Sequence, residues 1–137
     1  ISQEWLFNPC YEVWAHLPDP YHDELAARLR DRRWHFSPCL GVSEMLADLE
    51  RVGEVEAAPL PEGTHLVGTV FPADAGVIDT DVLFTGKLVV VGLRMACRVT
   101  PERVFTHRSY FLEQSARPVP VTTAHAFGAG DTVLLFL

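Results

Sequence analysis

Residues 102–113 read ERVFTHRSYFLE, and their side chains alternate in the way that predicts a β-strand. Successive residues of a strand point to opposite faces of a sheet, so odd-numbered and even-numbered positions should face opposite ways. The aromatic side chains of Phe105 and Phe111 share one face and are expected to lie in the core, whereas Arg108 and Tyr110 share the other. This segment therefore predicts a strand with one core-facing side.

Strand patterns also occur on both sides of this segment. THLVGTVF and KLVVVGL precede it, while PVPVTTAHAF and TVLLFL follow it and are separated by the turn GAGD. The ten prolines and nine glycines favour many turns and a strand-rich body over a helical bundle. With two further strands expected in the amino-terminal part, the predicted strands are 10–17, 51–58, 64–71, 87–93, 102–113, 118–127 and 132–137.

Residues 18–33 predict the main helix of the chain. Asp19 is a suitable N-cap residue, and Pro20 is expected at the first helical position. Apolar residues recur at intervals of four, which gives the helix a core-facing side. The residues expected on that side are Tyr21, Leu25 and Leu29.

A second, short helix is expected at residues 43–50, with Ser43 as its cap. The chain then consists of a strand–helix unit followed by a long strand-rich tail. This order predicts an α+β domain rather than a doubly wound sheet.

The chain has 137 residues, of which 48% are hydrophobic and 21% are charged. This length and composition predict one globular domain. No apolar run approaches the roughly 20 residues of a membrane-spanning helix, and no signal-like segment is seen at the amino terminus. We therefore expect a cytoplasmic protein with no membrane partner. The net charge of −7 argues against generic coating of nucleic acid but permits a local basic surface.

Several kinds of chemistry are excluded by the motifs that the chain lacks. There is no Walker loop, GxSxG elbow, HExxH helix or CxxC pair. The three cysteines, which are far apart, are expected to be buried thiols rather than zinc ligands or nucleophiles. Histidines within strand patterns are expected to be hydrogen-bonded structural residues. These residues are Cys10, Cys39 and Cys97, and His16, His65 and His125.

Arginines interleaved with aromatic residues are the remaining functional pattern. Arginine neutralises phosphate, and exposed aromatic faces stack on unpaired bases, so the combination is typical of single-stranded RNA recognition. The structural interpretation stays open, because cations are also favoured at the carboxyl end of a helix. The groups are residues 32–36, Arg94 with Arg98, and Arg103 with His107, Arg108 and Tyr110.

The segment HFSPCLGVSEMLADLERVGEV, residues 35–55, resembles the fifth CRISPR-associated (Cas) subunit family. That family is the Cascade component that holds the 5′ handle of the guide RNA (crRNA). The similarity centres on the loop Ser37–Glu44 and extends to NPCYEVWAHL upstream and to LRMACRV and RVFTHRSYFLE downstream. The Gly-Val-Ser-Glu version of the loop is most similar to members from type I-B-like systems.

The resemblance implies an RRM-like (ferredoxin-like) core, partial in this chain, with an appended antiparallel strand-rich region. Residues 1–58 would be the second half of that core, and residues 59–137 the strand-rich carboxyl-terminal region of one α+β domain. Because the family's first strand–helix half and its hairpin are not seen before Ile1, we expect the carboxyl-terminal portion of a longer subunit.

The function that this resemblance implies is a non-catalytic, RNA-binding assembly subunit of an antiviral ribonucleoprotein complex. It would cap the 5′ handle of the crRNA and contact the backbone and large subunits, with target DNA near the PAM as a further partner. The predicted RNA-binding residues are Arg32, Arg33, Trp34, His35, Phe36, Gly41, Ser43, Arg94, Arg98 and Arg108, and no catalytic residue, metal or cofactor is expected. Gly41 would permit a tight turn or a close approach to phosphate.

Two alternatives stay open. One branch of the family cuts precursor crRNA without a metal, which requires a base, an acid and a cation. Tyr21, His22 and His35 offer an acid or base, but the only lysine, Lys87, has no adjacent histidine, so we expect binding without catalysis. The second alternative, favoured by the acidic net charge, is a small α+β ligand-binding or structural domain that binds no RNA.

Overall fold

The computed structural model describes residues 12–34 and 47–136, which fall into two compact units. The first unit is Ile1–Gly53 and the second is Glu54–Leu137. None of the described helices is long and apolar enough to cross a membrane.

The first unit contains helix α1, Tyr21–Asp31. Pro20 rather than Asp19 is the N-cap residue, and no side chain caps the helix, so the expected cap and the expected helical position of Pro20 are both wrong. The helix ends at Asp31, and the following residue, Arg32, has a left-handed φ of 51°. This turn lets the Arg33 N–H donate to the Arg28 carbonyl at 3.1 Å. Of the expected core face, Leu25 and Leu29 are half-buried, whereas Tyr21 is 62% exposed.

Two expected elements of the amino-terminal part are wrong over the residues that the structure describes. Residues 12–17 form no strand, and residues 47–56 form neither the end of a helix nor a strand. A strand requires a hydrogen-bonded neighbour, and no described residue pairs with residues 12–17. Only the last part of the expected strand 51–58 is formed, as the start of β1.

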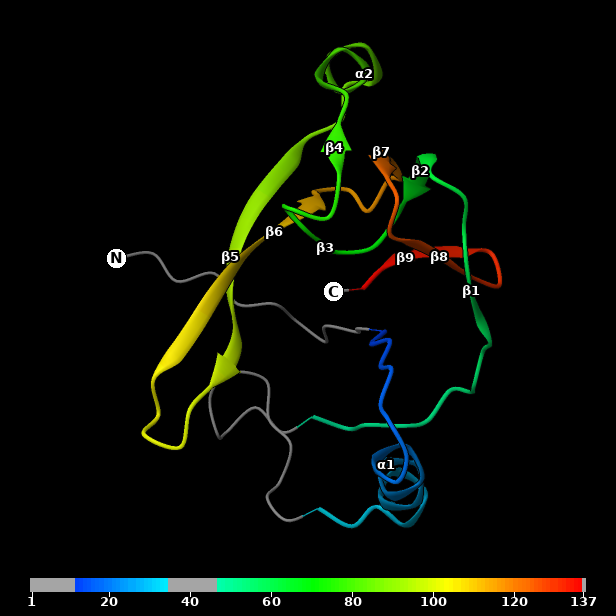
Figure 1. Ribbon diagram of the computed structural model, residues 1–137, viewed down its shortest axis with the longest axis vertical. Helices are drawn as coiled ribbons and strands as arrows, with labels where there is room; N and C mark the ends of the chain where they lie inside the picture. Colours follow the sequence, from blue (N-terminus) through cyan, green and yellow to red (C-terminus); the bar gives the residue numbers. More distant parts are fainter. Residues whose placement is uncertain (1–11, 35–46, 137) are drawn as a thin grey trace. The chain divides into compact units, whose positions relative to one another are not determined.

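The second unit is built from antiparallel strands arranged in three-stranded sheets (Figure 1). Their orders are β1-β8-β9, β2-β7-β4 and β3-β6-β5. A short helix, α2, joins β4 to β5. The elements are β1 Ala57–Pro59, β2 Gly63–Val67, β3 Phe71–Pro72, β4 Val77–Ile78, α2 Thr80–Gly86, β5 Val90–Val99, β6 Phe105–Glu113, β7 Val119–Thr123, β8 Ala126–Ala129 and β9 Thr132–Leu135.

The core of this unit lies where the three sheets meet. Val67 of β2, Phe71 of β3 and Val121 of β7 are almost fully buried and pack with residues of β8 and β9. The ring of Phe111 meets that of Phe71 edge-on, with centroids 6.0 Å apart and an interplanar angle of 66°. The expected core position of Phe111 is thus confirmed as a half-buried residue packed against the core.

The α+β class is confirmed, with mostly antiparallel sheets and two helices among the described residues. Strand β6 matches the expected strand 102–113 closely, and β8 and β9 form the expected hairpin around the turn at Gly130, whose φ is 59°. The expected strand 64–71 is interrupted and contributes to both β2 and β3, and the expected strand 118–127 is divided between β7 and β8.

Helix α2 was not expected from the sequence. Its N-cap residue Asp79 accepts a hydrogen bond from the backbone N–H of Asp81 at 2.9 Å and a longer one from that of Val82 at 3.4 Å. Lys87 ends the helix in a left-handed conformation, with φ of 51°. The chain then enters β5 at Val90, three residues after the expected start.

Candidate nucleic-acid interface

The longest hairpin of the second unit consists of β5 and β6. The strands pair from Val90 opposite Glu113 to Val99 opposite Phe105, with an irregularity between Ala96 and Arg98. In Figure 1 the turn of this green-to-yellow hairpin extends away from the other strands of the unit. Only the base of the hairpin is extended into a wider sheet, because β3 pairs with β6 only at Phe111 and Tyr110.

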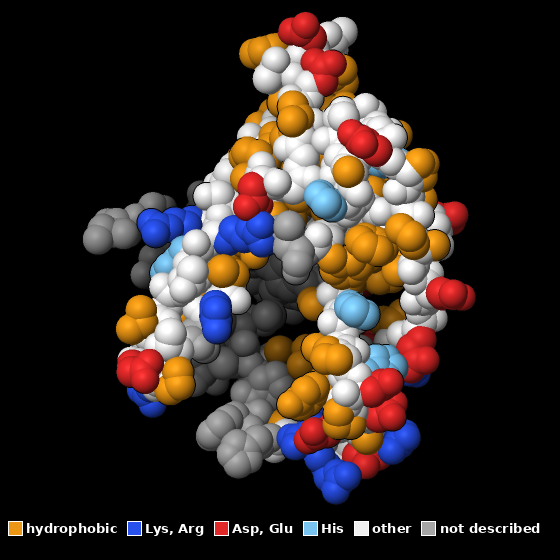
Figure 2. All heavy atoms as spheres, viewed as in Figure 1, with side chains coloured by type: hydrophobic (Ala, Val, Ile, Leu, Met, Phe, Trp, Pro, Cys, Tyr) orange, Lys and Arg blue, Asp and Glu red, His pale blue; other side chains and the backbone are white. Residues whose placement is uncertain are grey.

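Basic residues of the second unit are confined to this hairpin and its immediate flanks. All six of them lie within residues 87–117, together with only two of the nine carboxylates of the unit. The other seven carboxylates lie in the rest of the unit, which has no lysine or arginine. Figure 2 shows basic side chains over the hairpin and acidic ones over α2. The hairpin is thus a local basic surface on an acidic chain.

The predicted residues Arg94 and Arg98 are both exposed on β5, the outer strand of its sheet. Arg94 lies opposite Ser109 and Arg98 opposite Thr106, so neither faces a carboxylate across the hairpin. Because Ser109 is an odd-numbered and Thr106 an even-numbered residue of β6, the two arginines lie on opposite faces. Among the residues that the structure describes, neither has an ion-pair partner.

The third predicted arginine of this group, Arg108, is held by an acidic residue from another part of the unit. Its guanidinium donates to both carboxylate oxygens of Asp74, at 3.1 and 2.7 Å. These hydrogen bonds lower the pKa of Asp74 and raise that of Arg108. Arg108 is therefore committed to an intramolecular ion pair that braces the hairpin against the turn after β3.

The hairpin turn adds a cation that belongs to the arginine–aromatic groups of the sequence but not to the predicted RNA-binding residues. Arg103 is exposed, has a φ of 61°, and donates its backbone N–H to the Thr100 carbonyl at 2.9 Å. Neighbouring Glu102 is also charged, because a hydrogen bond from the Thr100 hydroxyl lowers its pKa below its ordinary value of 4.5. Glu102 and Arg103 thus place one negative and one positive group next to each other at the exposed end of the hairpin.

Two expectations for side chains of the hairpin are wrong. Phe105 was expected in the core but is 55% exposed, because the hairpin continues beyond the strands that cover its base. Cys97 was expected to be a buried thiol but is exposed at the irregularity of β5, where its thiol donates to the Thr106 carbonyl at 3.4 Å. The alternation of β6 predicted the face on which Phe105 lies, but it could not predict that strand β3 covers only the base of that face.

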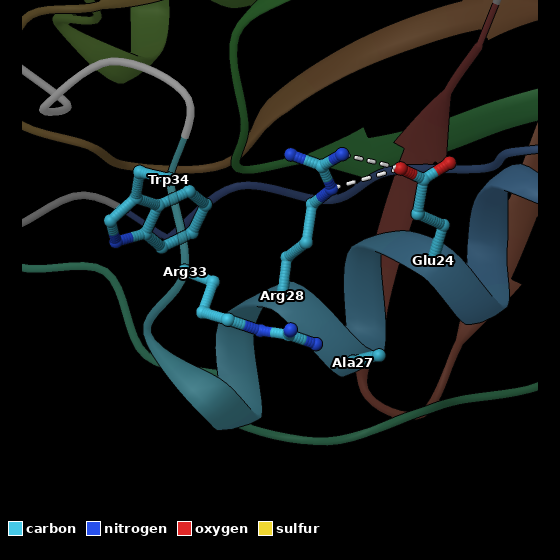
Figure 3. A pocket seen from close by; sticks show the side chains of 5 residues that line it. All are labelled: Glu24, Ala27, Arg28, Arg33 and Trp34. Atoms are coloured by element: carbon cyan, nitrogen blue, oxygen red, sulfur yellow. Dashed lines mark hydrogen bonds and ion pairs between the residues drawn. The ribbon is translucent and has the colours of Figure 1, made fainter.

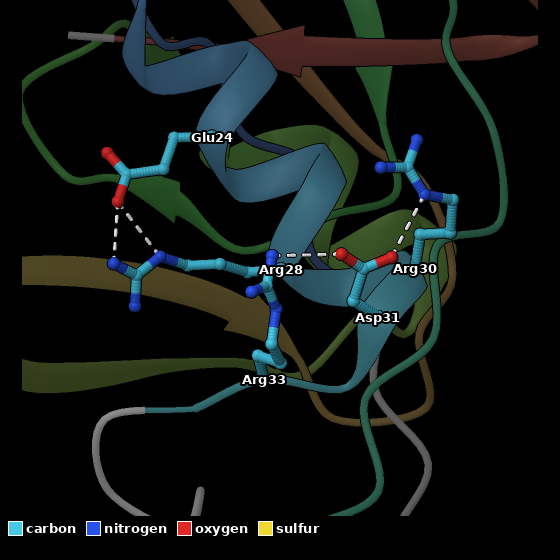
Figure 4. Close-up of polar contacts among 5 residues, drawn as sticks. All are labelled: Glu24, Arg28, Arg30, Asp31 and Arg33. Atoms are coloured by element: carbon cyan, nitrogen blue, oxygen red, sulfur yellow. Dashed lines mark hydrogen bonds and ion pairs between the residues drawn. The ribbon is translucent and has the colours of Figure 1, made fainter.

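The first unit carries a second group of predicted residues, Arg32, Arg33 and Trp34, at the end of α1. Arg33 pairs with Asp31 at 3.0 Å and Arg32 with Asp48 at 3.5 Å. Asp31 also accepts from Arg30, and this hydrogen bond is the main reason why the pKa of Asp31 is lowered (Figure 4). These arginines are exposed but partly neutralised, as expected for favourable charges at a helix end.

A shallow pocket of about 340 Å³ lies beside these residues and is lined by Glu24, Ala27, Arg28, Arg33 and Trp34 (Figure 3). Inside it, Arg28 donates to Glu24 at 2.9 and 2.6 Å, which satisfies the only carboxylate of its lining. Arg33 and the indole of Trp34 form the rest of the wall. The other predicted residues of this group, His35, Phe36, Gly41 and Ser43, lie outside the described residues.

Ligands for a metal occur together at one place in the described part of the chain. Asp19, His22 and Asp23 offer ligand atoms that lie within 4.8 Å of one another at the start of α1. The positive end of the helix dipole disfavours a cation there, and both carboxylates are exposed. Of the strand-pattern histidines, His65 fulfils its expected structural role, because its Nε2–H donates to the Pro61 carbonyl at 2.8 Å.

The described residues thus define an α+β protein whose second unit carries a protruding basic hairpin. Comparison of the chain with protein-family models, with curated proteins and with solved structures found no match.

Proposed function

We propose that the chain is a non-catalytic, RNA-binding assembly subunit of a CRISPR type I surveillance complex, where it binds the 5′ handle of the crRNA. The proposal combines the resemblance of residues 35–55 to the fifth Cas subunit family with the basic hairpin of the second unit. It includes the finer fold expectation that residues 1–58 correspond to the second half of an RRM-like core.

The observation that carries the RNA-binding part is the confinement of all basic residues of the second unit to residues 87–117. A protein of net charge −7 would repel RNA over most of its surface. Because the seven carboxylates outside residues 87–117 are accompanied by no lysine or arginine, the hairpin region is, among the described residues of this unit, the surface that attracts phosphate. The segregation therefore favours a polyanion over a neutral or cationic ligand.

The state of each arginine supports the same conclusion. Arg108 forms an ion pair with Asp74, and Arg117 forms one with Glu113. Arg94, Arg98 and Arg103 are exposed and have no carboxylate partner among the described residues. Three guanidinium groups on one hairpin that form no ion pair with any described residue offer the bidentate donors that bind phosphate oxygens best.

The test is to assemble the complex with its backbone and large subunits and to measure binding of a guide RNA over a series of salt concentrations. The variant replaces Arg94, Arg98 and Arg103 by alanine. On single-stranded nucleic acid, each phosphate contact adds about 0.7 to the steepness with which the logarithm of the binding constant falls with the logarithm of the salt concentration. Loss of three contacts should therefore make this slope shallower by up to about 2. Removal of the 5′ handle from the guide should weaken the wild-type complex and have little further effect on the variant.

The matched control replaces Arg28 and Arg30, which are exposed and each paired with a carboxylate on α1. This control removes charges of the same kind from a surface where they are already neutralised. Equal losses per removed charge in both variants would show that only total charge matters and would contradict the proposal. Cleavage of a precursor repeat RNA by the metal-free wild type would overturn the non-catalytic part.

A further inference from the structure

We infer that the outer half of one face of the β5–β6 hairpin is a stacking site for an unpaired base, with Phe105 as the stacking ring and Arg94 as the phosphate contact. This inference deepens the proposed function and rests on it. It assigns a base-stacking position on the hairpin and a binding residue, Phe105, that the predicted set of RNA contacts does not include.

The register of the hairpin brings these side chains to the same face. Arg94 lies opposite Ser109, and Ala96 lies opposite His107. Phe105 is two residues before His107 on the same strand, and alternate strand residues share a face. Phosphate-binding, polar and aromatic groups therefore follow one another along the outer part of this face.

The burial along β6 changes on this face from the base of the hairpin to its end. Glu113 is buried and Phe111 is half-buried against Phe71, whereas Ser109 and His107 are exposed and Phe105 is 55% exposed. The cover ends because β3 pairs with β6 at Phe111 and Tyr110 but no farther along the strand. A phenyl ring is thus presented to solvent where the sheet no longer needs one for its core.

The positions around Arg94 on this face are small. Gly92 and Ala96 of β5 and Ser109 of β6 are exposed, and they surround Arg94 on the same face. A Cβ built on Gly92 would come no closer than 3.9 Å to its nearest neighbour, the ring of Phe111. Small residues leave a low surface on which a flat base can lie, while the long Arg94 side chain reaches the backbone that links successive bases.

The chemistry of this face selects unpaired nucleotides. A base in a duplex is already stacked on both sides, so its flat face cannot meet an aromatic side chain without unstacking. An exposed phenyl ring on the same face as an arginine also suits an apolar protein partner in shape. The charge favours nucleic acid, because the only carboxylate on this face, Glu113, is buried at its base and held by Arg117.

The test uses the full chain with a fluorescent oligoribonucleotide of mixed sequence, either single-stranded or annealed to its complement, at fixed low salt. Phe105→Ala should bind the single strand about 5- to 150-fold more weakly than the wild type, the range that loss of one stacked base implies. Its binding to the duplex should change less than twofold. Val104→Ala, which changes an exposed residue just before β6, is the matched control and should bind like the wild type.

Phe105→Trp provides a second readout, because it keeps an aromatic face at this position. It should retain single-strand affinity and show fluorescence quenching beyond that of the wild type when the oligoribonucleotide is added. These results together would support stacking. Because Phe105 is exposed, both variants should fold like the wild type.

The failure of this inference is distinct from failure of the proposed function. If the wild type binds RNA and the arginine triple variant does not, but Phe105→Ala binds normally, stacking is wrong and the RNA-binding function stands. Equal binding of single strand and duplex by the wild type also overturns the inference. If Phe105→Ala lowers recovery of the partner subunits and not RNA affinity, the face binds protein instead. If the wild type shows no salt-dependent RNA binding, both proposals are wrong.

Discussion

Glu113 and Arg117 are joined twice across the turn between β6 and β7. The Arg117 side chain donates from Nη2 to Oε1 of Glu113 at 2.9 Å, and its backbone N–H donates to Oε2, also at 2.9 Å. The buried carboxylate accepts two more backbone N–H groups, from Val89 at 3.1 Å and Ser115 at 2.8 Å. This pair fastens the base of the basic hairpin to the segment that enters it.

The carboxylate of Glu113 predicts an acid-dependent loss of stability. Hydrogen bonds, first of all from the backbone N–H of Arg117, lower its pKa from 4.5 to about 2. Because the folded pKa lies below the unfolded one, the stability due to this group is complete above about pH 4.5 and is lost as the pH falls towards about 2. Chemical unfolding of the full chain over this range should show a falling free energy of unfolding.

The comparison that isolates this group is Glu113→Gln, which cannot ionise. The difference in free energy of unfolding between the wild type and Glu113→Gln should be largest near neutral pH and should shrink as the pH approaches 2. A difference that stays constant from neutral pH to pH 2 would show that the charge of Glu113 does not stabilise the fold.

Arg117 is predicted to stabilise the junction between α2 and the hairpin. Besides Glu113, its guanidinium donates to the carbonyls of Lys87 at 2.6 Å and Gly86 at 3.4 Å. Arg117→Ala would leave a buried carboxylate with fewer donors, and should lower the free energy of unfolding by about 1–3 kcal/mol. Urea unfolding measures this change.

The control for that prediction is Arg30→Ala, which breaks an exposed ion pair to Asp31 on α1. Exposed pairs contribute at most about 1 kcal/mol, so this control should be nearly as stable as the wild type. The free energy of unfolding of Arg117→Lys should lie between those of Arg117→Ala and the wild type, because an ammonium group cannot donate two parallel hydrogen bonds as a guanidinium does. Equal stability of Arg117→Ala and Arg30→Ala would contradict the anchoring role.

The strands of the second unit were the most predictable part of the fold, because their patterns coincide with real pairing. Alternation over residues 102–113 predicted β6, and the GAGD turn predicted the hairpin of β8 and β9. The same kind of pattern in residues 12–17 predicted a strand that is not formed. Alternation indicates that a segment is compatible with a sheet. Whether a strand forms also depends on a hydrogen-bonded neighbour, which residues far away in the sequence must supply.

Helix α2 and the cover over β6 show what sequence patterns omit. The apolar run at residues 82–84 lies within a helix of seven residues, α2. The clearest sequence feature that indicates this helix is its capping residue, Asp79. Phe105 continues the core pattern of Phe111, yet it is exposed because β3 is only two residues long. The extent of a neighbouring strand decides which member of an alternating pattern is buried.

For the candidate site, the sequence located the cations but not their partners. Arg94, Arg98 and Arg108 were all predicted from their neighbours in the chain. The acceptor for Arg108 is Asp74, which is 34 residues away and whose side chain no local pattern connects to it. Which arginines are used inside the fold and which remain open to a ligand is therefore a property of the tertiary structure.

Gly76 is predicted to be intolerant of any side chain. A Cβ at this position would lie 2.6 Å from Cγ1 of Val121 and 2.7 Å from the carbonyl oxygen of Thr122. Val121 is fully buried and the backbone of β7 is held by two neighbouring strands, so neither atom can move easily. Gly76→Ala should lower the free energy of unfolding by about 1–3 kcal/mol, as overpacking does.

Gly68→Ala is the matched control for this prediction, because nothing lies within 4 Å of a Cβ built at that position. Thermal unfolding of the two variants, measured side by side, should show a lower midpoint for Gly76→Ala only. A similar midpoint for both would mean that β4 and β7 are not as close as the structure places them.

Phe71 and Phe105 are predicted to differ sharply in their effect on stability, although both are phenylalanines on strands of one sheet. Phe71 is 1% exposed and packs in the core, so Phe71→Ala removes a large apolar side chain and leaves a cavity. We expect a loss of about 3–5 kcal/mol in the free energy of unfolding. Phe105 is mostly exposed, and Phe105→Ala should change that free energy by no more than about 0.5 kcal/mol. Urea unfolding of both variants checks the contrast, and a large loss for Phe105→Ala would show that the end of the hairpin is covered by the protein itself, which would remove the exposed ring from the candidate interface.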